Sequence, residues 1–181
     1  TEATMYAIRT ARAATGKLGI VKIEGGYHGS YDALMVSNKP DPTLAGSPDD
    51  PTPIPLPAVV PGEVHVVPYN NADALERVFK AHASSIACII MEPVLENIGI
   101  VVPDMGYLER VRQLCDQYGV LLVFDEVKTG LTAGPQGAAQ RLGIKPDLIA
   151  LAKSIGGGIP VAAFGGKREI METVINGKHA H

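Results

Sequence analysis

Residues 120–126 read VLLVFDE, an uninterrupted apolar run followed at once by two carboxylates. Such a run, with no polar alternation, is typical of a strand that is buried on both faces. The same arrangement recurs in residues 86–91 (IACIIM), which precede Glu92, and in residues 148–152 (LIALA), which precede Lys153. Together the three runs predict an α/β fold, in which a mostly parallel sheet carries helices on both faces.

Helical patterns separate these runs. Apolar residues at three- and four-residue spacing mark one of them, with Tyr107, Leu108, Val111, Leu114 and Cys115 on one face. The sequence predicts helices over residues 2–15, 72–82, 105–118, 135–142 and 167–175, with further strands over 19–24, 64–67 and 161–164. Residues 39–61 hold eight of the fourteen prolines and are expected to form an extended surface excursion rather than a domain linker.

The composition narrows the classes of protein. Hydrophobic residues make up 46% of the chain and charged residues 19%, as in a soluble globular protein. The net charge of −3 argues against a nucleic-acid binder, and no apolar run reaches the ~18 residues of a membrane span. Cys88 and Cys115 are expected to be buried and reduced, and the first residues lack the features of a signal peptide, so a cytoplasmic location is predicted.

The carboxyl ends of the strands are where a parallel sheet binds its ligands. Lys153 stands at one such end, and residues 154–158 (SIGGG) follow it. An ammonium beside the buried end of a strand must be paired, deprotonated or covalently bound. Two interpretations stay open from position alone: a lysine whose amine reaches solvent, or a reactive lysine that forms a Schiff base.

Asp125 follows a different buried strand. It suits a helix N-cap or a structural ion pair, and it equally suits an anion that holds a buried cation. Asp125 and Lys153 are 28 residues apart, with one helix and one strand between them, so both can face one cleft. A Schiff-base lysine and a carboxylate that keeps a pyridine nitrogen protonated are the two groups that a pyridoxal phosphate site requires.

Other chemistries find less support in the sequence. No G-x-G-x-x-G follows a predicted strand and no P-loop is present, which argues against a nicotinamide-dependent oxidoreductase. The histidines at positions 28, 65, 82, 179 and 181 show no metal-ligand spacing beyond the pair at the very end of the sequence. No metal site is therefore predicted.

Several segments together resemble the class III aminotransferases, which are fold type I pyridoxal phosphate enzymes. The resemblance is carried by residues 1–3 (TEA), 26–29 (GYHG), 91–93 (MEP), 124–130 (FDEVKTG) and 151–158 (LAKSIGGG), in the family's order and spacing. Within the family, the sequence is most similar to the glutamate-1-semialdehyde 2,1-aminomutases. The resemblance implies the large domain of an aspartate-aminotransferase-like fold, in incomplete form.

The resemblance also implies roles for single residues. Lys153 would carry pyridoxal 5′-phosphate as a Schiff base and move a proton during the reaction. Asp125 would keep the pyridine nitrogen protonated. Thr1 resembles the last residue of the family's phosphate loop and stands at a predicted helix N-terminus, where it could equally be a plain N-cap.

Four further residues match family positions around the cofactor ring. Tyr27 would stack on the ring and Val127 would pack on its opposite face, although either could belong to the core. His28 would support the site by hydrogen bonding, or be structural. Asn97 would lie near the ring oxygen. Alternatively, it would only stabilise the turn that contains Gly99. Glu92 also matches a family position, and no catalytic role is assigned to it.

The implied function is transfer of an amino group between small molecules, by an aminotransferase or by a 2,1-aminomutase. Leu131 and Thr132 depart from the family's usual residues, so a different substrate pocket, and hence another amine or β-amino-acid transaminase, stays open. The resemblance also implies that residues 1–181 are the central part of the large cofactor domain, without the N-terminal segment and the small C-terminal domain. The full-length enzyme would be a homodimer, and an inactive fragment is the remaining alternative.

Overall fold

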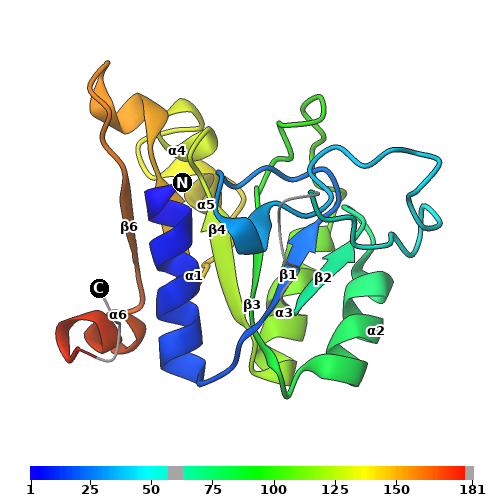
Figure 1. The fold of residues 1–181 in the computed structure, drawn as a ribbon. Coiled ribbons are helices and arrows are strands. Elements are labelled where there is room, and N and C mark those ends of the chain that lie inside the picture. The colour runs from blue at the N-terminus through cyan, green and yellow to red at the C-terminus, as the bar shows by residue number, and fades with distance from the viewer. Residues whose placement is uncertain (57–62, 178–181) are drawn as a thin grey trace.

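The computed structural model describes residues 1–56 and 63–177 and shows one six-stranded sheet between two layers of helices (Figure 1). The strand order is β2-β1-β3-β4-β5-β6; every neighbouring pair is parallel except β5 and β6, which are antiparallel. The strands are β1 (Gly19–Ile23), β2 (Val64–Val67), β3 (Ile86–Met91), β4 (Leu121–Asp125), β5 (Leu148–Leu151) and β6 (Ala163–Gly166). This confirms the predicted mostly parallel α/β fold.

The helices lie close to their predicted positions. They are α1 (Glu2–Thr15), α2 (Ala72–His82), α3 (Tyr107–Tyr118), α4 (Thr129–Thr132), α5 (Gly137–Arg141) and α6 (Arg168–Ile175), with single 3₁₀ turns η1 (Asp32–Leu34) and η2 (Lys153–Gly156). The N-cap of α2 is Asn71, whose side chain accepts a hydrogen bond from Ala74 N. The first α-helical residue of α3 is Tyr107 rather than residue 105, because Gly106 takes a left-handed conformation with φ 82°.

Two elements differ from the sequence-based expectation. The short helix α4 was not expected, since its sequence TGLT contains residues of low helix propensity. The last strand, β6, lies two residues later than the predicted range of 161–164. Of the proline-rich excursion, residues 39–56 contain no helix or strand, as expected, while residues 57–61 lie outside the described residues, as do His179 and His181.

Apolar side chains cover both faces of the sheet. On one face, α2 and α3 pack over residues such as Val21, Ile89 and Phe124, and on the other α1 and α6 pack over Ile20 and Val123. Cys88 and Cys115 are free and buried, as predicted, and burial raises the pKa of the Cys88 thiol to about 12. Among the described residues, no helix is long and apolar enough to cross a membrane.

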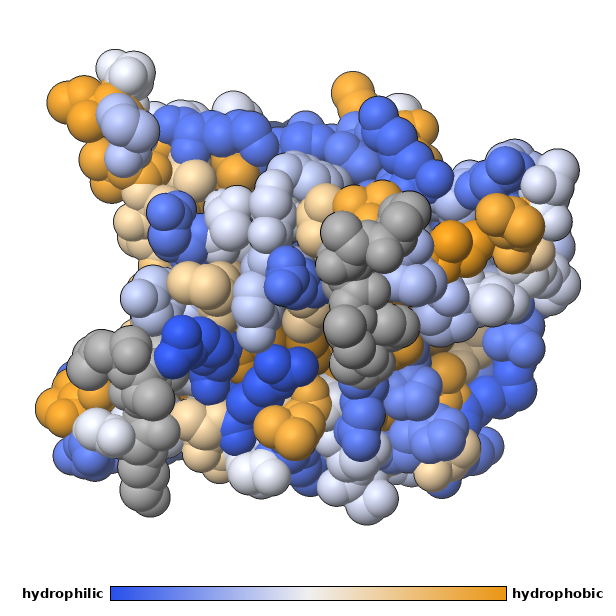
Figure 2. Space-filling model, in the orientation of Figure 1, coloured by the Kyte–Doolittle hydropathy of each residue, from blue (hydrophilic) through white to orange (hydrophobic). Residues whose placement is uncertain are grey.

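Exposed apolar side chains occur mainly on loops. Figure 2 shows such side chains at the upper left, over the loop between η2 and β6. The loop that follows β3 carries others. Because both loops follow the carboxyl end of a strand, these side chains stand on the edge of the sheet where ligands are expected. They are Ile98, Ile100, Val101, Val102, Met105, Ile159 and Val161.

A buried carboxylate joins elements near the amino ends of β4 and β5. Asp147 Oδ2 accepts hydrogen bonds from Leu122 N (2.7 Å) and Arg112 Nη1 (2.9 Å), and its Oδ1 lies 2.6 Å from Lys167 Nζ. Burial by itself would raise the pKa of Asp147, but hydrogen bonds from Lys167, Leu122 and Arg112 outweigh burial and hold that pKa below its usual value. The ionised carboxylate therefore ties α3 to the start of α6.

Replacing Asp147 should weaken the fold in a pH-dependent way. Asp147→Asn should lower the free energy of unfolding by about 2 kcal/mol at pH 7, because two cations lose a charged partner. A carboxyl with a lowered folded-state pKa stabilises fully above its usual value of 3.8, and the stabilisation is lost as the pH falls through the folded-state value. Urea titrations at pH 7 and pH 3 should therefore show the gap between wild type and variant narrowing at pH 3.

Asp116→Asn is the matched control, because Asp116 pairs with the same arginine but its side chain is 63% exposed. It should change the free energy of unfolding by less than about 0.5 kcal/mol. Equal effects of the two variants would contradict the assignment of Asp147 as the stabilising partner.

Candidate active site

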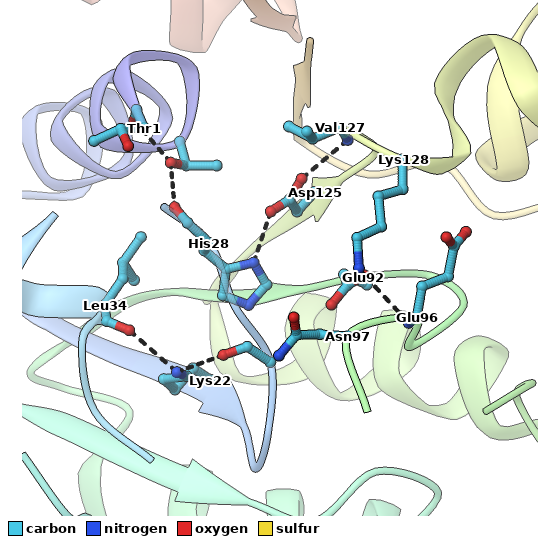
Figure 3. Close-up of polar contacts among 12 residues, drawn as sticks. Thr1, Lys22, His28, Leu34, Glu92, Glu96, Asn97, Asp125, Val127 and Lys128 are labelled. Carbon is cyan, nitrogen blue, oxygen red and sulfur yellow. Dashed lines mark hydrogen bonds and ion pairs between the residues drawn. The ribbon is translucent and has the colours of Figure 1, made fainter. Parts of the chain in front are cut away.

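Polar residues from four strand ends meet at one edge of the sheet, beside the N-terminus of α1 (Figures 1 and 3). The segment after β1 supplies Tyr27 and His28, while β3, β4 and β5 end next to Glu92, Asp125 and Lys153. They line a cavity of ≈ 110 Å³. Its lining consists of Thr1, Thr4, Tyr27, His28, Gly29, Glu92, Asp125, Val127, Lys128 and Lys153.

A buried pair lies at the base of this cavity. His28 Nδ1 is 2.7 Å from Asp125 Oδ2, and both side chains are at most 5% exposed. The other carboxylate oxygen, Oδ1, accepts a hydrogen bond from Val127 N at 3.0 Å. An ionised carboxylate only accepts, so opposite that form Nδ1 is the donor. The contact fixes both the orientation of the Asp125 carboxylate and that of the imidazole ring.

The turn that carries His28 is attached to the first turn of α1. Thr4 Oγ1 donates to His28 O (2.6 Å), and Ser30 N donates to Thr1 Oγ1 (3.1 Å). Gly29 has φ +90°, and a Cβ there would lie 2.6 Å from Thr1 Cα, closer than any real contact. Only glycine therefore allows this approach of the turn to the helix.

Thr1 stands at the N-cap position of α1, but its side chain does not cap the helix. Its hydroxyl instead accepts the hydrogen bond from Ser30. Since Thr1 and Thr4 both line the cavity, the N-terminal end of α1 faces it. An uncapped helix N-terminus favours an anion through its free N–H groups and the helix dipole.

Lys153 begins η2 in a left-handed conformation, with φ 48°, which is unusual for a residue other than glycine. Lys153 is exposed, which agrees with the interpretation in which its amine reaches solvent. The chain turns out over the edge of the sheet once β5 ends at Leu151. In the part of the chain that the structure describes, the amine has no hydrogen-bond or ion-pair partner, although it lines the cavity.

Of the remaining predicted residues, two line the cavity and one does not. Tyr27 is 44% exposed and its hydroxyl lies 3.4 Å from Ser30 Oγ, while Val127 is partly buried. Asn97 instead donates from Nδ2 to Gly25 O at 2.9 Å and lines a neighbouring hollow of ≈ 430 Å³. The structure thus brings six of the seven predicted residues to one cavity. The seventh, Asn97, contacts Gly25, which lies in the turn that carries Tyr27.

Glu92 and Lys128 line the cavity as well, and sequence reasoning gave neither a role. Glu92 Oε2 accepts from Glu96 N (3.2 Å) and lies 3.7 Å from Lys128 Nζ, while Oε1 is buried without a partner among the described residues. Burial raises the pKa of Glu92, and the electrostatic interactions with His28 and Lys128 oppose that rise. Glu92 directly follows β3 and Lys128 lies three residues after the end of β4, and these positions near strand ends were the available signal.

Comparison with known proteins gives consistent results. The sequence matches the model of the class III aminotransferases over residues 1–181. It is 51% identical over 174 residues to glutamate-1-semialdehyde 2,1-aminomutase of Persephonella marina and 48% identical over 174 residues to that of Natranaerobius thermophilus. Both alignments cover 96% of this chain and 40% of the relative, so the chain spans less than half the length of these proteins.

Solved structures show the same fold. An omega-transaminase from Sphaerobacter thermophilus superimposes with a TM-score of 0.87 at 38% identity, over 94% of this chain and 39% of that chain. A glutamate-1-semialdehyde aminomutase variant from Pseudomonas aeruginosa PAO1, solved in complex with PMP, has a TM-score of 0.77 at 30% identity, over 93% of this chain and 36% of that chain.

The close approach at Gly29 makes a substitution there costly. Gly29→Ala should lower the free energy of unfolding by about 3 kcal/mol, since strain from the positive φ adds to a clash with the Thr1 backbone. Gly16→Ala is the control: Gly16 has φ +70° and nothing within 4 Å of the added Cβ, so only about 1 kcal/mol of strain is expected. Urea titration of both variants measures the difference, and equal losses would contradict the packing of Gly29 on Thr1.

Proposed function

The chain belongs to the class III aminotransferase family, and we propose from this that it binds pyridoxal 5′-phosphate at the sheet edge and transfers amino groups between small molecules. The observation that carries the proposal is the shared cavity of Lys153 and the Asp125–His28 pair. The two groups that such a site requires come from different strands and face the same space. Residues 1–181 would then form part of the cofactor-binding domain.

The residues present fit the cofactor. Lys153 offers an amine without a partner among the described residues. Asp125 offers a carboxylate held at both oxygens. The N-terminal end of α1, where the Thr1 side chain does not cap the helix, suits a phosphate. Tyr27 and Val127 line the same cavity and supply an aromatic and an apolar surface for a ring, whereas Asn97 would need to leave Gly25 to reach it.

Each side chain has a task that follows from its surroundings. When bound, pyridoxal phosphate supplies an aldehyde that combines with amines and a ring that withdraws electrons from a carbon losing its proton. Asp125, fixed by His28 and Val127 N, holds a proton on the ring nitrogen as its counter-charge. Lys153, whose amine can move, takes a proton from the substrate carbon and returns it as general base and acid. Tyr27 and Val127 restrict the ring and exclude water from it.

Two versions of the reaction have support. Relatives with 51% and 48% sequence identity carry the name glutamate-1-semialdehyde 2,1-aminomutase. Their name favours a reaction in which the amino group returns to the same carbon skeleton. The high TM-score with an omega-transaminase, together with Leu131 and Thr132, favours transfer to a second molecule. A requirement for an added amino acceptor, measured as product formed with and without it, distinguishes the transaminase from the aminomutase.

We also propose that the protein acts as a homodimer in the cytoplasm. Seven large apolar side chains are exposed on the loops after β3 and η2, which suits an edge covered by a second copy. The two free, buried cysteines suit a reducing compartment. Sedimentation velocity tests the dimer, and a monomer at all concentrations would contradict it.

Attachment of the cofactor to one lysine tests the proposed function directly. After incubation with pyridoxal phosphate and reduction by borohydride, mass spectrometry should find the added mass on the peptide that contains Lys153. Lys153→Ala should abolish that mass and lower turnover by at least about 100-fold, because the proton-transferring amine is gone.

Lys128→Met is the matched control, since Lys128 lines the same cavity but is held near Glu92. This variant should keep the label on Lys153. A label on Lys128 in the wild type, or none on either lysine, would contradict the assignment.

A further inference from the structure

Lys22 is the fourth of the five residues of β1 and is fully buried, although it is a lysine in an otherwise apolar strand. Its Nζ has four oxygen atoms within hydrogen-bond distance: Gly26 O (2.8 Å), Leu34 O (3.1 Å), Val36 O (2.5 Å) and Asn38 Oδ1 (2.6 Å). Figure 3 shows Lys22 below the turn that carries His28, bonded to Leu34. The amine thus joins β1 to both ends of the segment 26–38.

Burying the Lys22 ammonium costs free energy, so the hydrogen bonds of the ammonium must compensate for that cost. Burial lowers the pKa of Lys22 to about 7, and the Glu24 carboxylate opposes that effect. A methionine would fill similar space without the desolvation penalty. What methionine cannot supply is a donor for the three backbone carbonyls. Among the described residues, no backbone N–H outside the helices and strands donates to the carbonyls of Gly26, Leu34 or Val36.

The segment held by Lys22 has little regular structure of its own. Its helical part is the single 3₁₀ turn η1, and Ser37 takes a left-handed conformation with φ 49°. A segment of this kind depends on contacts with its surroundings for its conformation. Gly26, bonded to Lys22 at one end, directly precedes Tyr27 and His28. The position of His28 against Asp125 therefore depends on where Gly26 is held.

We propose that Lys22 is a positioning residue for the candidate site: by sharing its three N–H donors among Gly26 O, Leu34 O, Val36 O and Asn38 Oδ1, it fixes the turn so that His28 reaches Asp125. The proposal rests on the proposed function only in treating Tyr27 and His28 as site residues. The His28–Asp125 contact belongs to the cofactor-free chain, so it can be measured whether or not pyridoxal phosphate binds.

A purely structural role for Lys22 predicts a different result from a positioning role. A structural role lowers global stability and leaves the His28–Asp125 contact intact in the folded molecules. A positioning role loosens residues 25–38 and moves His28, while the strands β3 and β4 stay as they are. The readout must therefore report on the His28 ring and on local backbone opening, rather than on unfolding alone.

The experiment compares Lys22→Met with Lys17→Met in the cofactor-free chain. Lys17 is the matched control, because its Nζ also donates to backbone carbonyls, those of Ala83 and Gly119, away from the site. The ring proton on His28 Nδ1 is followed by NMR with ¹⁵N-labelled histidine, and amide hydrogen exchange is followed by residue. In Lys22→Met the His28 proton signal should be lost or shifted, and exchange in residues 25–38 should accelerate at least about tenfold. Exchange in β3 and β4 should not change, and Lys17→Met should change neither readout.

An unchanged His28 signal with unchanged exchange in Lys22→Met overturns the proposal. If Lys22→Met does not fold, the same readouts are taken on Lys22→Gln, whose shorter amide can reach only some of the four oxygens. If the His28 ring-proton signal of Lys22→Gln is the same as that of the wild type, the proposal is likewise overturned. Failure of the wild-type chain to bind pyridoxal phosphate would instead count against the proposed function and leave this comparison unaffected.

Discussion

The buried carboxylate of Asp125 is the constraint on which the rest of the site depends. A carboxylate only 4% exposed is unfavourable unless hydrogen bonds or an opposite charge compensate for the lost water. Val127 N satisfies one oxygen and His28 the other. His28 is 97 residues away in sequence, so the compensation requires β1 and β4 to end at the same edge of the sheet. The parallel topology meets that requirement, with β3 between the two strands.

The sheet brings His28 near Asp125, but local contacts decide its final position. The segment 25–29 leaves β1 as a glycine-rich turn, which has no helix or strand hydrogen bonds to hold it. Side chains from three places hold it: Thr4 of α1 donates to the His28 carbonyl, Lys22 of β1 donates to Gly26 O, and Asn97 donates to Gly25 O. One imidazole–carboxylate contact thus links the first helix, the first strand and the fourth strand.

The sequence predicted the sheet and helices well because buried parallel strands are continuous apolar runs, which few other structures imitate. The same reasoning predicted which strand ends carry Asp125 and Lys153. It could not predict the bond from Asn97 to Gly25, which joins residues 72 apart. It missed Lys22, although a lysine between apolar residues in a predicted buried strand was a visible signal. It left open whether the Lys153 amine reaches solvent, because the direction of the chain after β5 depends on backbone conformation at one residue.

Two lysines line the cavity, and their surroundings differ in a way that separates their chemistry. Lys128 Nζ lies 3.7 Å from Glu92 Oε2, so its amine is held beside a buried carboxylate. Lys153 has no such partner among the described residues, and its backbone is held in a left-handed conformation. A nucleophilic amine must give up its proton and move toward its target. The ion pair restrains movement of the Lys128 amine, whereas no described partner restrains the Lys153 amine, and this difference supports the proposal that Lys153 is the reactive lysine.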